Sequence, residues 1–173
     1  MLTLWFILLG FSPFAAEVTD ASQSVSSFKE EAKSAIKTLS SSLIEPLSRN
    51  DINTVETTVN EVFLDADKKG RPVRFGIGIL DKHGIAVAGG YIIGAFKGED
   101  FSKYDFVKKA FKKRKITQNR LYFQDRSELF MICAPLVQQK RVVGAIVLGF
   151  DPTQVKNDYG LSTEKFLSIN FNK

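Results

Sequence analysis

The sequence predicts an α+β domain in which a long N-terminal helix packs on a five-stranded antiparallel sheet. Three observations predict this class. Apolar residues recur at helical spacing up to residue 63, and after residue 71 they form short strand-like runs that turn sequences separate. Of the 173 residues, 44% are apolar and 25% charged, which is typical of one folded domain and excludes collagen, low-complexity disorder and a polytopic membrane protein.

The N-terminus carries an apolar run of the size found in signal peptides. Residues 2–11, LTLWFILLGF, contain no charge, and the small residues Ala15 and Ala16 follow shortly after them. A signal peptide needs an apolar core of 7–15 residues, whereas a transmembrane helix needs about 20. We therefore expect residues 1–21 to be a signal peptide, or alternatively an N-terminal membrane tether, which places the chain in the periplasm or outside the cell.

A single apolar stripe predicts a long helix over residues 22–45. Its members lie three or four residues apart, with Ser, Lys and Glu between them: Val25, Phe28, Ala32, Ala35, Ile36, Leu39, Leu43 and Leu47. Because Pro46 has no backbone N–H, we expect the helix to end or kink there. The stripe packs on the sheet of its own domain or, alternatively, on a second copy of the chain in a homodimer.

A second helix is expected to begin near Asn50 or Asp51 and to end at the Lys-Lys-Gly sequence of residues 68–70. Its apolar positions again keep helical spacing: Ile52, Val55, Val59, Val62 and Phe63. Residues 22–70 therefore form a helical N-terminal segment.

Residues 71–155 are expected to form the sheet and one further helix. Residues 75–90 predict a hairpin around the turn Asp81-Lys82-His83-Gly84, and residues 98–115 predict a loop that leads into a short amphipathic helix. Three more strands are expected, over residues 120–124, 128–137 and 141–150. The last of them is apolar over most of its length, which favours the middle of the sheet. We expect residues 156–173 to be a short polar tail.

The densest basic run lies on the predicted helix near residue 110: Lys108, Lys109, Lys112, Lys113, Arg114 and Lys115. The net charge of the chain is +5. A solvated helix face is one interpretation of this run, and a surface for anionic lipid, polysaccharide or a partner protein is the other. Because no nucleic-acid-binding motif accompanies the charge, we expect no nucleic-acid partner.

No arrangement of residues in the sequence predicts catalysis. His83 is the one histidine and stands in a turn, where we expect it to be exposed. Cys133 is the one cysteine and lies in an apolar strand, where an inert buried thiol is expected. The sequence offers no nucleophile with a matching base and no metal-ligand cluster. We therefore expect neither an enzyme nor a bound cofactor or metal.

Four segments follow one another as ILDKHGIAVAGG, GEDFSKYDFVKKAF, LFMICAPLV and VVGAIVLGFD. They contain an Asp-x-x-Gly turn at residues 81–84, a Gly-x-Asp-hydrophobic-Ser loop at residues 98–102, Pro135, and a Val-Gly pair at residues 143–144. In this order the segments resemble a single Cache domain, the PAS-like extracytoplasmic sensor module of bacterial receptors. The resemblance covers residues 22–155 and includes the long leading helix.

The resemblance implies that a small ligand, such as a short carboxylate, an amino acid or an amine, lies between the concave face of the sheet and the loops and helix above it. The expected ligand-binding residues are the polar, aromatic or sulfur-containing side chains near that junction: Tyr91, Lys103, Tyr104, Phe106, Arg120, Tyr122, Met131 and Cys133. Alternation along a strand places Arg120 and Tyr122 on one face, and Met131 and Cys133 on one face of the next strand.

The start of the predicted pocket helix departs from the family members that bind amino acids. In those members an Arg and two aromatic residues stand at the start of this helix, whereas this chain, which resembles the family elsewhere, has the sequence Lys-Tyr-Asp-Phe at residues 103–106. A Lys is a point charge and lacks the two-pronged geometry with which Arg holds a carboxylate. Amino-acid specificity therefore does not follow from the resemblance alone.

Two functions remain open at this stage. The first is an extracytoplasmic small-molecule-binding sensor domain that has no signalling output domain of its own and passes its ligand state to a partner, such as a membrane-bound signalling protein. The alternative is a ligand-free interaction or structural module of the same fold, which presents its long helix or its basic run to a partner. Saturable binding of a small molecule distinguishes the two.

Overall fold

A computed structural model describes residues 14–68, 75–90, 97–122 and 127–173 of the chain. Within these ranges the helices and strands, in chain order, are α1 (Phe14–Ser48), α2 (Ile52–Lys68), β1 (Gly76–Asp81), β2 (Ala86–Gly90), α3 (Asp105–Lys113), β3 (Thr117–Tyr122), β4 (Glu128–Gln138), β5 (Arg141–Phe150), α4 (Pro152–Tyr159) and α5 (Thr163–Ser168). No helix in these ranges is both long and apolar enough to cross a membrane.

The strands form one five-stranded sheet in the order β2-β1-β5-β4-β3, and every neighbouring pair is antiparallel. This arrangement confirms the predicted α+β class. The apolar strand β5 lies in the middle, as its composition predicted, because a strand buried on both faces has no need of alternating polar residues. β3 begins at Thr117, three residues before its expected start, and it is one edge of the sheet.

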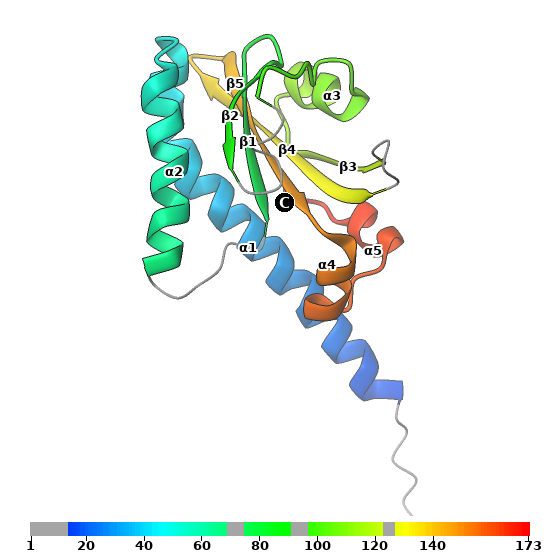
Figure 1. Cartoon of the computed structure of the whole chain (residues 1–173). Helices are drawn as coiled ribbons and strands as arrows, with labels where there is room; N and C mark the ends of the chain where they lie inside the picture. The colour runs from blue at the N-terminus through cyan, green and yellow to red at the C-terminus, as the bar shows by residue number, and fades with distance from the viewer. Residues whose placement is uncertain (1–13, 69–74, 91–96, 123–126) are drawn as a thin grey trace, which may run out of the picture.

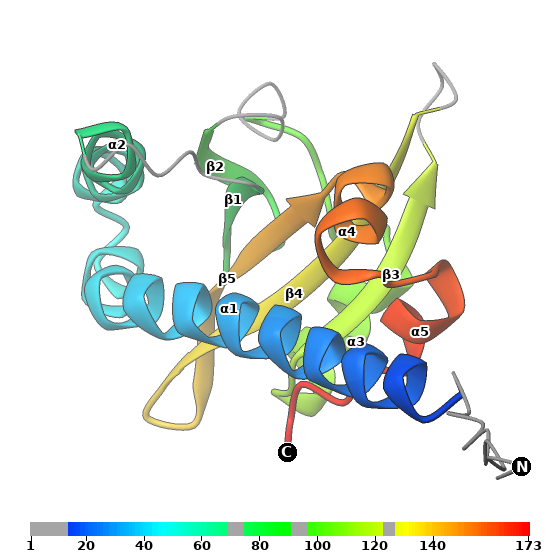
Figure 2. The same ribbon diagram turned by 90° about the horizontal axis from the view of Figure 1, so that it is seen from below.

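Helix α1 runs across one face of the sheet (Figures 1 and 2). Six members of its predicted apolar stripe are buried there: Phe28, Ala32, Ile36, Leu39, Leu43 and Leu47. Each fully buried Leu or Phe side chain contributes about 1.5–3 kcal/mol relative to its exposure to water. The stripe is thus covered by the sheet of its own domain, which was one of its two predicted packing modes.

The boundary between α1 and α2 differs from the prediction, because α1 continues through Pro46 to Ser48. Pro46 stands in the last turn, where its missing N–H removes one intrahelical bond. Its carbonyl oxygen still accepts the N–H of Arg49 at 3.2 Å and that of Asp51 at 2.9 Å. Asp51 then caps α2, since its Oδ1 accepts the Thr54 N–H at 3.1 Å. Hydrogen bonds from Thr54 lower the pKa of Asp51.

Helix α2 packs against β2, which is the other edge strand of the sheet. Val55 and Val59 are buried, and Val62 and Phe63 pack partly buried against the same core, as the helical spacing predicted. A side chain at Gly90 of β2 would overlap the ring of Phe63. A glycine at this position therefore lets the strand and the helix approach closely.

The β1–β2 turn and the β4–β5 turn are built differently. In the β1–β2 turn, Asp81 Oδ1 accepts the N–H groups of His83 at 2.8 Å and Ile85 at 2.9 Å, and Gly84 takes a φ of 87°. His83 is exposed there, as expected. The β4–β5 turn instead uses Gln139 and Lys140 at φ values of 48° and 64°. Non-glycine residues in this left-handed region cost about 1–2 kcal/mol each.

Residues 156–173 are not the polar tail that the sequence predicted. After β5 the chain forms α4 and α5 and returns to α1 and β3. Its buried side chains are apolar: Val155, Leu161, Phe166, Ile169 and Phe171. Phe166 stacks on Phe130 of β4 with ring centroids 4.3 Å apart, and the Phe28 ring of α1 packs edge-on against it at 6.1 Å.

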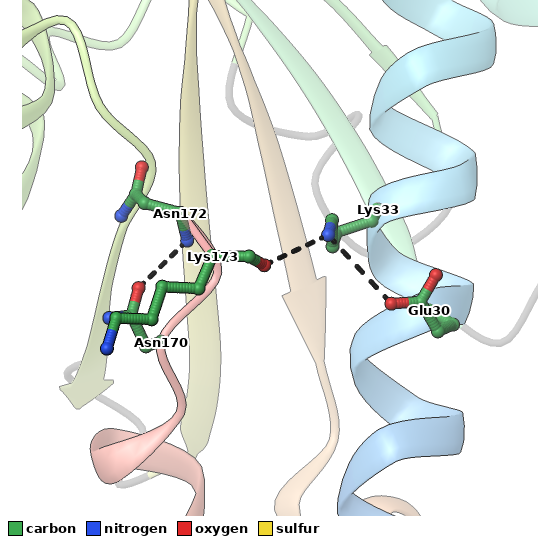
Figure 3. Close-up of polar contacts among 5 residues, drawn as sticks. All are labelled: Glu30, Lys33, Asn170, Asn172 and Lys173. Atoms are coloured by element: carbon green, nitrogen blue, oxygen red, sulfur yellow. Dashed lines mark hydrogen bonds and ion pairs between the residues drawn. The ribbon is translucent and has the colours of Figure 1, made fainter.

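The end of this C-terminal segment is held by polar contacts with α1 (Figure 3). Lys33 donates from Nζ to the backbone oxygen of Lys173 at 3.2 Å and also lies 3.9 Å from the Glu30 carboxylate. The Asn172 N–H donates to Oδ1 of Asn170 at 3.0 Å. The bond from Lys33 to Lys173 joins the end of the segment to α1, and the bond between Asn172 and Asn170 lies within the segment.

Candidate functional site

Helix α3 lies on the opposite side of the sheet from α1 and covers the face formed by alternate residues of β4 and β5. Phe106, Val107 and Ala110 are the buried residues of α3, which confirms the predicted amphipathic helix. They share a core cluster with Met131 and Cys133 of β4. This side of the sheet is the face on which the resemblance to sensor domains implies a ligand.

The predicted ligand-binding residues divide between the two faces of the sheet. Phe106, Met131 and Cys133 lie together on the α3 side, with Tyr104 packed against them as a partly buried side chain. Arg120 is paired with Phe130, and Tyr122 with Glu128, so both belong to the face that α1 and α5 cover. The predicted set therefore cannot line one pocket. Tyr91 lies outside the described residues.

Sequence analysis missed the polar residues that β3 presents to α3. Asn119 is paired with Met131, and Thr117 with Cys133, which places both on the α3 side. Thr117 donates from Oγ1 to the Phe106 carbonyl at 2.7 Å and so fixes the first turn of α3 to the strand. They were missed because the strand was predicted to begin at residue 120, whereas it begins at residue 117 and so includes both side chains.

A groove of about 410 Å³ runs between α3 and the edge strand β3. We call it the α3–β3 groove, and its lining residues are Asp105, Phe106, Lys109, Ile116, Thr117, Gln118, Asn119 and Leu167. The lining combines apolar side chains with amides and one charge of each sign. A cavity of this size falls in the range of small-molecule sites, which are mostly apolar with a few converging polar groups.

The charged groups of the groove come from one face of α3. Asp105 and Lys109 stand four residues apart, hence on neighbouring turns, and both are exposed. Asp105 also lies 3.7 Å from Lys108 Nζ. Lys103 points elsewhere: its Nζ lies 3.9 Å from Glu99 and 5.4 Å from the centre of the Tyr104 ring.

The loop that leads into α3 is bonded to the β1–β2 turn. The Phe101 N–H donates to the Gly84 carbonyl at 2.9 Å, and the Gly98 N–H to the Ala86 carbonyl at 2.7 Å. A Cβ at Gly84 would lie 2.9 Å from Cβ of Ser102. The Asp-x-x-Gly turn and the Gly-x-Asp-hydrophobic-Ser loop noted in the sequence therefore pack against each other and position the start of α3.

The side chains of β4 beneath α3 are buried. Cys133 has no exposed surface, and burial raises the pKa of its thiol because the apolar surroundings disfavour the thiolate. Met131 is 1% exposed beside it. Both side chains belong to the core under α3 and neither lines the α3–β3 groove, and the burial of the Cys133 thiol agrees with the prediction from its apolar strand.

The segment that joins α3 to β3 is also bonded to the C-terminal residues. Asn172 accepts the Ile116 N–H at 2.9 Å and donates from Nδ2 to the Ile116 carbonyl at 2.9 Å. Gln118 donates from Nε2 to the Leu167 and Ile169 carbonyls at 3.1 and 2.6 Å. Together with the Thr117 bond to α3, these contacts connect the α3 side of the sheet to the C-terminal segment.

Arg120 and Tyr122 form a separate cluster on the other face. The guanidinium of Arg120 lies 4.8 Å from the centre of the Tyr122 ring and 3.6 Å from Oε1 of Glu128. Glu128 Oε1 is buried and accepts no hydrogen bond, so its contact with Arg120 is an ion pair without good hydrogen-bond geometry. This pair joins β3 and β4 at the end of their ladder, on the opposite face of the sheet from Met131 and Cys133.

The fold is similar to that of several solved sensor domains. An extracellular domain assigned to a histidine kinase has a TM-score of 0.65 and 16% identity over 87% of this chain. A domain of a Vibrio parahaemolyticus protein assigned to the sensory box/GGDEF family has a TM-score of 0.64 and 15% identity over 87% of the chain. The sensory domain of the Campylobacter jejuni chemoreceptor Tlp3, solved with isoleucine bound, has a TM-score of 0.61 and 11% identity over 93% of the chain.

The chain spans 60%, 63% and 80% of the lengths of these three solved domains. A scan against protein-family models finds no match, and a search of curated proteins finds none either. At such low identity the likeness establishes the arrangement of helices and strands. The chain has the fold of a single Cache/PAS-like sensor domain.

Proposed function

We propose that the chain is an extracytoplasmic sensor domain that binds a small molecule on the α3 side of its sheet and passes the ligand state to a partner protein. One observation carries the proposal: the α3–β3 groove combines the apolar side chains of Phe106 and Ile116 with the amide of Asn119 and with one charge of each sign from α3. The fold of sensor domains supports it. The uncharged run of residues 2–11 supports the extracytoplasmic location.

The lining of the groove favours a small amino acid, a short carboxylate or an amine. Asp105 can bind an ammonium group and Lys109 a carboxylate, while the Asn119 amide can donate to or accept from either end of such a ligand. Phe106 and Ile116 offer apolar contact for a side chain. The Campylobacter jejuni sensory domain of similar fold was solved with isoleucine bound, which is a ligand of this class.

The hydrogen bonds around residues 116–118 supply a route from the groove to a partner. A ligand that moves α3 also displaces Thr117, whose neighbours Ile116 and Gln118 are bonded to the C-terminal segment. That segment in turn contacts α1 through Lys33. A partner that contacts α1 or the C-terminal segment would therefore sense the occupied groove. The proposed role is binding and transmission, without catalysis.

A thermal-melt screen of the full chain tests the proposal. The panel contains amino acids, short carboxylates and amines, each added to the parent protein and to Asn119→Ala. A ligand of the folded state at a hundred times its Kd adds about 2.7 kcal/mol, which raises Tm by several degrees. We expect such a rise in the parent and its loss in Asn119→Ala. Arg120→Ala and Tyr122→Ala are the matched controls, because both side chains lie on the other face, and they should keep the rise.

Two results would contradict the proposal. One is a flat response of the folded parent across the panel. The other is a rise in Tm that Asn119→Ala keeps and Arg120→Ala loses, since this would place the ligand on the α1 side of the sheet.

The exposed basic face of α3 favours a second candidate, the ligand-free interaction module. Lys108, Lys109, Lys112 and Lys113 are all exposed, and Arg114 and Lys115 continue the run. A surface of this kind attracts an acidic partner. For this module, reversing the charge in Lys113→Glu would abolish partner binding while Asn119→Ala would not affect it, which is the opposite of the pattern expected for the sensor.

A further inference from the structure

A second cavity, which we call the end cavity, lies near the junction of α1 and α2. Its volume is about 610 Å³, within the range of small-molecule sites. The α1–α2 connection, the β1–β2 turn and the β4–β5 turn each contribute lining residues, and none of these residues lines the α3–β3 groove. It is therefore a separate site.

The walls of the end cavity contain backbone in an uncommon conformation. Among the described residues, four that are not glycine have a positive φ, and three of them belong to the turns around this cavity: Asn50 at 57°, Gln139 at 48° and Lys140 at 64°. Asn50 and Gln139 line the cavity directly. Asn50 follows the end of α1, and Gln139 and Lys140 form the two-residue loop of the β4–β5 hairpin, so both turns that line the cavity have a well-defined shape.

The charges of the end cavity are unbalanced. Lys82 and Arg141 line it, and neither forms an ion pair with any of the described residues. Asp81 is the acidic lining residue, and its Oδ1 already accepts the N–H groups of His83 and Ile85. Two cations facing one partly engaged carboxylate leave a net positive site, which favours an anionic ligand.

The uncharged lining indicates what else such a ligand contains. The side chains of Ser48, Asn50, Gln138 and Gln139 offer hydroxyl and amide groups that both donate and accept hydrogen bonds. Leu47, Val142 and Val143 add an apolar patch. We propose that the end cavity binds a hydroxylated carboxylate of the size of a sugar acid: Arg141 and Lys82 hold the carboxylate, the amides hold the hydroxyl groups, and the apolar patch contacts the C–H face of the ring.

Isothermal titration of the full chain with D-glucuronate and D-glucose tests this site, because the two sugars differ in one carboxylate. We expect glucuronate to bind saturably and at least tenfold more tightly than glucose. Arg141→Gln should weaken glucuronate binding by at least tenfold, and Lys82→Gln should also weaken it. Lys113→Gln, which removes the same charge from the exposed face of α3, should leave the Kd unchanged.

Three outcomes would overturn the proposal. Equal affinity for glucuronate and glucose would show that the carboxylate is not recognised. The absence of saturable glucuronate binding would show that the cavity does not bind sugar acids. Glucuronate binding that survives Arg141→Gln and is lost in Asn119→Ala would place the sugar acid in the α3–β3 groove. The last result would support the proposed sensor function while rejecting the end cavity, so the two proposals fail separately.

Discussion

Gly144 of β5 shows how a single residue fixes the distance between α1 and the sheet. A Cβ built at this position would overlap the carbonyl oxygen of Leu80 on β1 and would lie 3.0 Å from Cδ1 of Leu47 on α1. The backbone oxygen cannot move without breaking the β1–β5 ladder, in which Gly144 is paired with Asp81. The Val-Gly pair noted in the sequence therefore has a packing explanation.

We expect Gly144→Ala to lower the free energy of unfolding by about 1–3 kcal/mol, the usual effect of overpacking a core. Chemical denaturation measures the change. If Leu47 were the main obstacle, the double variant with Leu47→Ala would cancel the overlap; because the Leu80 oxygen remains, we expect no rescue. An unfolding free energy equal to that of the parent would contradict this account of Gly144.

Cys133 offers a chemical probe of the α3 side of the sheet. It has no exposed surface, and burial raises the pKa of its thiol, so the reactive thiolate is scarce and inaccessible in the folded chain. We expect a thiol reagent at pH 8 to label the folded protein on the order of a hundredfold more slowly, or slower still, than the protein in denaturant. Mass spectrometry of the alkylated protein measures both rates. Equally fast labelling in the two states would contradict the close packing of α3 on this face of the sheet.

At the scale of elements, α5 tests whether the C-terminal segment belongs to the core. Phe166 has no exposed surface and Leu167 is 42% exposed, although they are neighbours on one short helix. Phe166→Ala should lower the free energy of unfolding by about 3–5 kcal/mol, as loss of a buried Phe does. Leu167→Ala, the matched control, should change it by about 0.5 kcal/mol or less. Similar small effects of both substitutions would mean that the segment packs loosely.

The C-terminal segment, residues 156–173, also shows why the sequence did not predict every helix. The long stripes of α1 and α2 repeat often enough to identify helices, and the hairpin turns mark the strands. In the C-terminal segment, the buried residues Leu161, Phe166, Ile169 and Phe171 lie five, three and two positions apart. Each short helix or turn buries one or two side chains, so no period emerges.

The candidate site was predictable only in part, for a related reason. Alternation correctly grouped Arg120 with Tyr122 and Met131 with Cys133, but it does not determine which face of β3 matches which face of β4. The pairing of Arg120 with Phe130 decides this, because a shift of one residue would turn every side chain of the strand to the other face. Register depends on contacts between residues that are distant in sequence. Asn119 could therefore be identified as a groove residue only from the structure.

At the scale of the whole molecule, the sheet separates two core clusters of buried side chains. One face is filled by α1, α4, α5 and the aromatic cluster around Phe28, and the other carries α3 and the proposed ligand groove. The segment around Ile116 is bonded to both sides. This layout agrees with the predicted long helix on a five-stranded sheet, and the transmission that we propose would run through these bonds.

Hydrogen–deuterium exchange of the full chain, with and without the compound that most raises its Tm in the screen, tests the central claim most directly. We predict slower exchange in residues 105–122, which include α3 and β3, and a smaller change in residues 163–173, which are bonded to the α3–β3 connection. Helix α2 at residues 52–68, which lines neither the α3–β3 groove nor the end cavity, serves as the internal reference and should be unaffected. Protection that leaves residues 105–122 unchanged would contradict a ligand site on the α3 side of the sheet.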